Sequence, residues 1–210
     1  MSSIRTLLLA DGASDQPLGA HVAALAAGFG VTLNVVAPDL RRLSPGHALE
    51  DRLRCVLNFD PDFDLLVVHR DSENRLAEER VHEISRGVRA ADVDWPTIPV
   101  VPVRMTEAWL LLDEREIRTV AGRPSGTRPL NLPSPRAVES LADPKATLEQ
   151  ALDRASGFAG RRLVKFKRDF GEHRRQLLER LDRSGPVATL EAWKGLEQAV
   201  EDVVRTLVPG

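Results

Sequence analysis

Short apolar runs alternate with longer amphipathic stretches over the first hundred positions of the chain. Four runs have the length and the nearly continuous apolar character of strands buried on both faces: 4–10, 31–36, 64–68 and 98–103. Pro99 and Pro102 favour an edge position for the last of them, because proline cannot donate a hydrogen bond to a neighbouring strand. Strands that alternate with helices in this way predict an α/β fold, with a mainly parallel four-stranded sheet flanked by helices.

The stretches between these runs predict helices. An Ala-rich helix is expected to end near Ala27, before two glycines. A second helix is expected to begin at Ser44-Pro45 and to run to about Asn58, since proline is tolerated in a first turn. Further helices are predicted over 73–89 and 106–113.

The pattern changes after Gly122. We expect an α/β domain over 1–122, a Pro/Gly-rich connector over 123–142 and a helical C-terminal extension over 143–210, packed on the same domain. Asp143-Pro144 has the residue types of a helix start. Apolar residues between 162 and 181 predict one amphipathic helix, and a last helix is predicted over 190–207. Trp109 and Trp193 occupy apolar positions and are predicted to lie in the core.

Composition narrows the class of protein. Of the 210 residues only one is a cysteine, which excludes an internal disulfide and a Cys-based zinc site and fits a reducing compartment. No apolar run is long enough to span a membrane and no signal peptide is evident, so we expect a cytoplasmic protein without membrane contact. Glycine-rich P-loop spacing is absent, and the HRD triplet at 69–71 lacks the downstream Asn of a kinase catalytic loop.

Charge is unevenly distributed. The formal net charge is −2, yet residues 161–183 carry nine basic and four acidic side chains. Two interpretations stay open for this basic segment. It could line a nucleic-acid groove, or it could be a solvated helix face with intrahelical pairs such as Arg168–Glu172. The basic residues that would line the groove are Arg161, Arg162, Lys165, Lys167, Arg168, Arg174 and Arg175.

Acidic residues follow three of the four predicted strands. Asp11 follows the first strand, Asp71 and Glu73 follow the third, and Glu107 comes shortly after the fourth. Ligands of open parallel sheets gather at the carboxyl ends of the strands. Carboxylates that meet there repel one another unless a cation neutralises them, and oxygen ligands of this kind suit Mg²⁺ or Mn²⁺. The alternative is that each acid caps a helix or lies in a solvated turn, as Asp15 could do.

Three segments carry a resemblance to a known family: VHRDSEN (68–74), VPVRMTEAWLLLD (101–113) and LADPKATLEQAL (141–152). Together with a strand that ends in an acid and a glycine, they resemble the Toprim-like proteins. The similarity is to an uncharacterised bacterial subgroup, related to the nucleases of overcoming-lysogenization-defect systems and often encoded beside defence ATPases. It extends from about Leu7 to Leu152 and implies a Rossmann-like Toprim fold.

The resemblance also implies roles for individual residues. Asp11 stands where these proteins normally have a glutamate that serves as general acid or base. Asp71 and Glu73 take the positions of the acid-x-acid metal ligands, although the second is usually aspartate. Glu107 resembles an additional acid of the subgroup, and Lys145 could neutralise a phosphate. Weaker candidates for contact with substrate or phosphate are His69, Arg104, Arg161, Arg162, Lys165 and Lys167.

These observations lead to one expectation and two alternatives. The expectation is a Mg²⁺-dependent phosphodiesterase that acts on nucleic acid as a phage-defence effector, with a homodimer as the expected assembly. The first alternative is a catalytically inactive Toprim-like module that binds an ATPase partner, which the departures at Asp11 and Glu73 favour. The second is a metal-dependent enzyme that acts on a small phosphorylated molecule.

Overall fold

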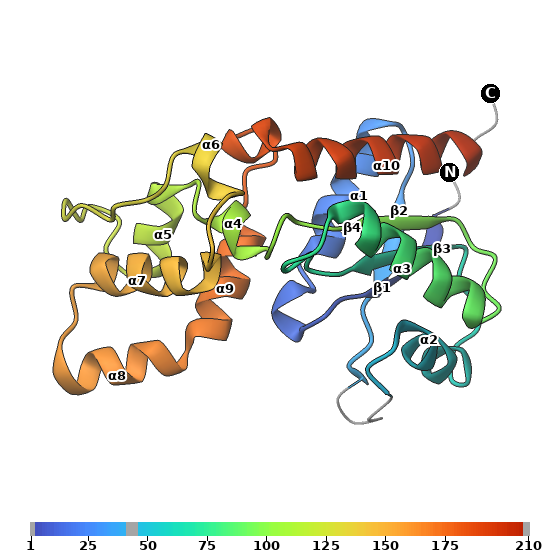
Figure 1. Cartoon of the computed structure of the whole chain (residues 1–210), viewed down its shortest axis with the longest axis horizontal. Coiled ribbons are helices and arrows are strands. Elements are labelled where there is room, and N and C mark those ends of the chain that lie inside the picture. Colours follow the sequence, from blue (N-terminus) through green and yellow to red (C-terminus); the bar gives the residue numbers. More distant parts are fainter. Residues whose placement is uncertain (1–2, 41–45, 208–210) are drawn as a thin grey trace. The chain divides into compact units, whose positions relative to one another are not determined.

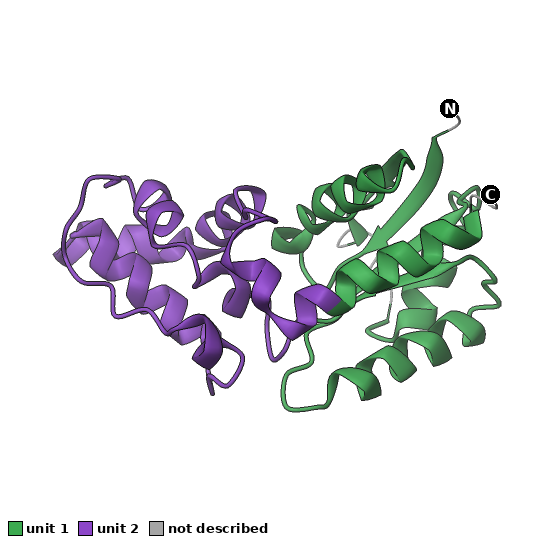
Figure 2. Cartoon of the chain, turned by 90° about the horizontal axis from the view of Figure 1, so that it is seen from above, with its two compact units in different colours: residues 1–101, 195–210 green, residues 102–194 purple. Residues whose placement is uncertain are grey.

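The computed structural model describes residues 3–40 and 46–207. Its internal contacts define two compact units, of which the first comprises residues 1–101 and 195–210 and the second residues 102–194 (Figure 2). The chain passes from the first unit to the second after residue 101, whereas the α/β domain expected from the sequence extended to residue 122. The last part of the chain belongs to the unit that contains the sheet.

The first unit is built on a four-stranded sheet in which every neighbouring pair of strands is parallel (Figure 1). The strand order is β2-β1-β3-β4. The predicted α/β class, the parallel sheet and the edge position of the proline-containing strand are therefore confirmed. The strands are β1 (Ile4–Leu9), β2 (Leu33–Val36), β3 (Leu65–His69) and β4 (Thr97–Val100).

Both faces of the sheet are covered by helices, which explains why its strands read as continuous apolar runs. Leu7 and its register partner Leu66 belong to a core shared with α2 (Leu49–Leu57) and α3 (Ala77–Ala90). Helix α1 (Leu18–Gly28) covers the opposite face. There Gly19 lies so close to β2 that a Cβ atom at this position would come within 2.8 Å of Val35 Cγ1.

Two predicted helix starts differ from the observed ones. The proposed start at Ser44-Pro45 lies outside the described residues, and residues 46–48 are not helical, so that α2 begins at Leu49. The third helix was expected from Glu73, but α3 begins at Ala77. Glu73 has φ 55°, a left-handed conformation that cannot continue into a right-handed helix, so the chain turns before α3 begins.

The second unit consists of helices and their connections. Its core contains the indole rings of Trp109 and Trp193, which are fully buried and meet edge to face with centroids 5.2 Å apart, as predicted for both residues. Helix α10 begins in this unit, and its residues from Gly195 belong to the first. The helices are α4 (Glu107–Leu110), α5 (Glu114–Val120), α6 (Pro135–Val138), α7 (Pro144–Ser156), α8 (Gly160–Arg168), α9 (Phe170–Glu179), the 3₁₀ helix η3 (Pro186–Thr189) and α10 (Glu191–Leu207).

Two predicted helices are interrupted in this unit. The helix expected over 106–113 ends at Leu110, and Asp113 instead caps α5 by accepting a hydrogen bond from Glu116 N at 3.0 Å. The helix expected over 162–181 is divided at Asp169, where α8 ends and α9 begins. The start at Asp143-Pro144 is confirmed, since the Asp143 carboxylate accepts a hydrogen bond from Ala146 N at 2.8 Å.

None of the helices in the described part of the chain combines the length and the apolar character that a membrane crossing needs.

Candidate functional site

The strand order places a change of winding direction between β1 and β3. The chain passes from β1 to β2 on one side and then returns across β1 to β3 on the other. Ligands of open α/β sheets bind at such a switch point, outside the carboxyl ends of the strands. Asp11 follows β1 there, and Arg70 and Asp71 follow β3 directly.

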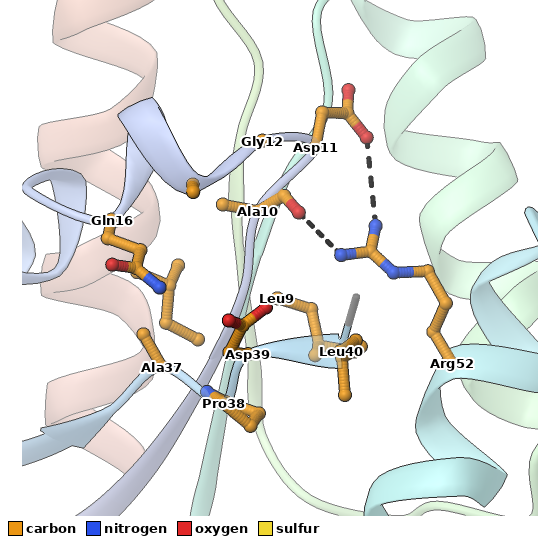
Figure 3. A pocket seen from close by; sticks show the side chains of 12 residues that line it. Leu9, Ala10, Asp11, Gly12, Gln16, Ala37, Pro38, Asp39, Leu40 and Arg52 are labelled. Atoms are coloured by element: carbon orange, nitrogen blue, oxygen red, sulfur yellow. Dashed lines mark hydrogen bonds and ion pairs between the residues drawn. The ribbon is translucent and has the colours of Figure 1, made fainter. Parts of the chain in front are cut away.

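These residues contact one another. The Asp11 carboxylate accepts a hydrogen bond from Arg70 Nη1 at 2.6 Å and a longer one from the Asp71 backbone nitrogen at 3.3 Å. A third group reaches the same carboxylate: Arg52 of α2 lies 3.8 Å from Asp11 Oδ1 and also donates to the carbonyl oxygen of Ala10 (Figure 3). We call Asp11, Arg52, Arg70 and Asp71 the strand-end cluster.

Arg52 is a site residue that the sequence did not reveal. It lies 41 positions after Asp11, inside an ordinary amphipathic helix, and no local motif marks it. The one available signal was electrostatic, because acids gathered at a sheet edge require cations nearby. Burial and the neighbouring Arg70 lower the pKa of the Arg52 guanidinium. Both arginines contact the Asp11 carboxylate.

A cavity of about 190 Å³ opens beside the strand-end cluster. Apolar side chains from the end of β1 and the segment after β2 line it, together with Gly12, Gln16, Asp39 and Arg52 (Figure 3). Pockets for drug-sized ligands usually measure roughly 300–1,000 Å³. The cavity therefore suits one group of a ligand, such as a phosphate or a sugar, rather than a whole nucleotide.

His69, the last residue of β3, is fully buried beneath the cluster. Its Nε2 atom lies 3.3 Å from Asp71 Oδ1, and its Nδ1 atom lies 3.9 Å from Asp15 Oδ2. Burial acts to lower the pKa of His69, but the hydrogen bond to Asp71 and the charges of Asp15, Asp71 and Asp11 together raise it above its ordinary value. Asp15 also accepts a hydrogen bond from Gly12 N at 3.2 Å and so closes the turn η1 (Ala13–Asp15) after β1.

Glu73 contacts a different partner from the other acids of this edge. Its carboxylate pairs with Arg80 Nη2 at 3.1 Å, and 62 % of its side chain is exposed. Arg80 also donates to the carbonyl oxygen of Asp71 at 2.9 Å, so it holds the turn between β3 and α3 together. A non-glycine residue with positive φ is uncommon, and Glu73 shares this feature with Arg104 (φ 59°) of the second unit.

The fit of a divalent metal to this edge depends on how many protein ligands it needs. Nowhere in residues 3–40 or 46–207 do three or more His, Cys, Asp or Glu side chains form a group that could hold a metal ion. Mg²⁺, however, is commonly held by one or two carboxylates and completes its shell with water and substrate phosphate. Asp11 and Asp71, which are in contact through the Asp71 backbone nitrogen, have the residue types of this second arrangement, whereas Glu73 contributes its carboxylate to Arg80.

Glu107 belongs to the second unit and forms a buried ion pair there. Its side chain and that of Arg174 are about 5 % and 7 % exposed, and Arg174 Nε donates to Glu107 Oε1 at 2.8 Å. The pair joins α4 to α9, and its two residues lie 67 positions apart along the chain. The other carboxylate oxygen, Oε2, is buried and has no hydrogen-bond partner among the described residues.

The remaining candidates also belong to the second unit. Lys145 is exposed at the start of α7, with Nζ 5.9 Å from the centroid of the Phe170 ring. Arg104 is half-buried in the segment before α4. Lys167 forms an ion pair with Asp153 at 2.7 Å, which also raises the pKa of its ammonium group.

The other cations of α8 have no acidic partner. Across the described ranges no ion pair includes Arg161, Arg162, Lys165 or Arg168, and all four side chains are exposed. The intrahelical pair expected between Arg168 and Glu172 is absent, because Glu172 pairs with Arg175 and Gln176 instead. The seven basic residues singled out in the sequence thus divide into three that acids neutralise and four that they do not.

Comparison of the chain with known protein families, with curated proteins and with solved structures gives no match.

Proposed function

We propose that the chain is a Toprim-like, Mg²⁺-dependent phosphodiesterase that acts on nucleic acid. The observation that carries this proposal is the meeting of Asp11 and Asp71 from two different strands at the switch point of the sheet. One carboxylate from each residue would suit a Mg²⁺ ion that takes its other ligands from water and from the substrate's phosphate. When bound, such an ion would polarise a phosphoryl oxygen and lower the pKa of a bound water.

The chain's own residues would then have separate roles. Asp11 and Asp71 would hold the ion, and Arg52 and Arg70 would bind the non-bridging oxygens of the phosphate, a task for which guanidinium groups are well suited. The ion pairs that these arginines form with Asp11 keep them at the strand ends before substrate arrives. His69 would orient Asp71 through the contact between Nε2 and Oδ1.

The same ion pairs favour one alternative. With Asp11 paired to Arg70 and Glu73 paired to Arg80, the sheet edge is close to neutral without any metal. A catalytically inactive module that binds a partner such as an ATPase would have this property. The small cavity favours the other alternative, an enzyme that acts on a small phosphorylated molecule.

Calorimetric titration of Mn²⁺ and Mg²⁺ tests the proposal. The titration is made with a non-hydrolysable phosphorothioate oligonucleotide present, so that a site completed by substrate is also detected. Wild type should bind the ion in this titration. In a separate assay it should cleave an unmodified nucleic acid only when the ion is present. Asp71→Asn should lose both the ion binding and the cleavage. Asp62→Asn is the matched control, because Asp62 is almost completely exposed and lies before β3 rather than after it.

The possible results separate the three functions. Retention of metal binding or cleavage by Asp71→Asn would contradict the proposal. Metal binding with hydrolysis of a small phosphodiester but of no DNA or RNA would favour the small-molecule enzyme. A wild-type protein that neither binds the ion nor cleaves any substrate would leave the partner-binding module as the remaining alternative.

A further inference from the structure

Helix α8 carries a concentrated positive charge on a part of the surface that contributes no residue to the core. Gly160–Arg168 contains five basic residues and no acidic one, and none of its residues is buried. Arg161, Lys165 and Arg168 recur at intervals of four and three, and Arg162 is three positions before Lys165. Residues at these intervals lie on one side of a helix. The four unpaired cations therefore form a single exposed stripe.

A pocket with two aromatic walls lies on the same helix. Phe158, Arg162, Lys165, Phe166 and Asp169 line an open cavity of about 350 Å³, which we call the α8 pocket. Phe158 precedes α8 in the turn after α7, and its ring meets that of Phe166 edge to face, with centroids 5.7 Å apart. The ring of Phe166 in turn stacks on His173 of α9 at 4.1 Å, which holds it in place.

The rings of Phe158 and Phe166 remain partly accessible to solvent instead of being buried in the core of the unit. Phe158 is 36 % exposed, and the neighbouring Val164 is also largely exposed. Aromatic rings that remain accessible beside unpaired cations are typical of surfaces that bind unpaired nucleobases: the rings stack on bases while the cations neutralise the phosphates between them. A duplex would supply the phosphates but no free base face, because its bases stack on one another.

We infer that the α8 pocket binds single-stranded nucleic acid, with a base against Phe158 and Phe166 and the flanking phosphates on Arg162 and Lys165. Arg161 and Arg168 extend the positive stripe along the strand beyond the pocket. Asp169, the one acid of the pocket, accepts hydrogen bonds and suits the exocyclic amino group of a base. The inference rests on the proposed function in one respect. It specifies the substrate of the proposed phosphodiesterase as single-stranded rather than duplex nucleic acid.

Fluorescence anisotropy with the full chain tests this inference. The probes are a fluorescein-labelled oligo(dC) 20-mer, whose bases carry an exocyclic amino group, and a duplex of the same length, both in EDTA so that no metal-dependent contact or cleavage contributes. We expect tighter binding of the single strand. Phe158→Ala should weaken that binding by roughly five- to 150-fold, as the loss of one stacking platform does. Phe158→Leu keeps an apolar side chain of similar size and should also weaken binding.

The salt dependence of binding tests the cations separately. Each phosphate contact contributes about 0.7 to the slope of log K against log salt for a single strand, so Arg162→Ala/Lys165→Ala should reduce this slope by roughly 1.4. Arg175→Ala removes a cation from α9 that already has acidic partners, Glu172 and Glu179, and should leave the slope unchanged. Val164→Ala is the apolar control on α8 itself.

Several results would overturn the inference. They are equal or tighter binding of the duplex, an effect of Phe158→Ala no larger than that of Val164→Ala, or equally effective competition by polyglutamate, which would reveal a general polyanion surface. Absence of oligonucleotide binding in EDTA, combined with metal binding that depends on Asp71, would refute this inference alone. Oligonucleotide binding without any metal binding would refute the metal-dependent function and leave the inference intact.

Discussion

The buried pair of Glu107 and Arg174 provides a quantitative test of how the second unit is stabilised. We expect Arg174→Met to lower the free energy of unfolding by about 3–5 kcal/mol, since it leaves an uncompensated carboxylate inside the protein. At a separation of 2.8 Å the attraction amounts to about 6 kcal/mol for an effective dielectric constant near 20. Desolvation of both groups offsets much of this attraction, so the pair matters most when only one partner is removed.

A double-mutant cycle isolates the interaction. Glu107→Leu should destabilise the unit by a similar amount, whereas Glu107→Leu/Arg174→Met should be close to wild type, because two apolar side chains replace two charges of similar volume. Urea unfolding can be followed by tryptophan fluorescence in a Trp95→Phe background. The remaining indoles, Trp109 and Trp193, both lie in the core of the second unit.

Two results would refute this reasoning. One is a loss of less than about 1 kcal/mol in Arg174→Met, which would mean that water reaches the carboxylate. The other is a double variant whose loss of unfolding free energy equals the sum of the losses in the two single variants. The double variant also separates two roles of Glu107. If wild type has the proposed nuclease activity and the folded double variant retains it, the acid is structural, whereas a folded but inactive variant would favour the catalytic role that the Toprim resemblance implies.

Further predictions concern His69 and Gly19 of the first unit and Gly171 of the second. The pKa of His69 is raised, so the folded protein holds the imidazole proton more tightly than the unfolded chain does. The resulting stabilisation is complete below the ordinary pKa of about 6.5 and declines as the pH rises through the pKa of His69 in the folded protein. The stability difference between wild type and His69→Asn, measured by urea unfolding in EDTA, should therefore shrink from pH 6 upwards, and a difference that grows with pH would contradict the assignment. Gly19→Ala should destabilise by about 1–3 kcal/mol, since its Cβ would come within 2.8 Å of Val35 Cγ1. Gly171→Ala, whose Cβ meets no atom within 4 Å in α9, should instead stabilise by about 0.5–1 kcal/mol, and thermal unfolding that shifts in the same direction for both would disprove the packing argument.

The parts of the fold that sequence predicts well are those whose pattern is local. A strand buried on both faces produces an unbroken apolar run, and proline excludes a central position, so the sheet and its edge follow directly. The break at Asp169 could not be foreseen in the same way. The apolar positions around it keep a nearly helical spacing, so the periodicity continues through the break between α8 and α9.

Side-chain partners were much less predictable than positions. The sequence placed Asp11 and Asp71 at one edge of the sheet, and they do adjoin. It could not show that Arg52 reaches the same edge or that Glu73 pairs with Arg80, since both depend on how α2 and α3 pack. The carboxylate of Glu107 illustrates the limit most clearly, because an acid after a strand looks the same whether it faces a ligand or a buried arginine.

Helix α8 has a consequence for how this protein can change over evolutionary time. Because none of its residues is buried, exchanges at its exposed positions, which exclude Leu163 and Phe166, leave the packing of the second unit almost untouched. Surface substitutions of this kind usually alter stability by no more than about 0.5 kcal/mol. The charge of its exposed positions can therefore vary under selection, or be redesigned, with little penalty in folding, so that binding preference and fold can evolve as separate traits.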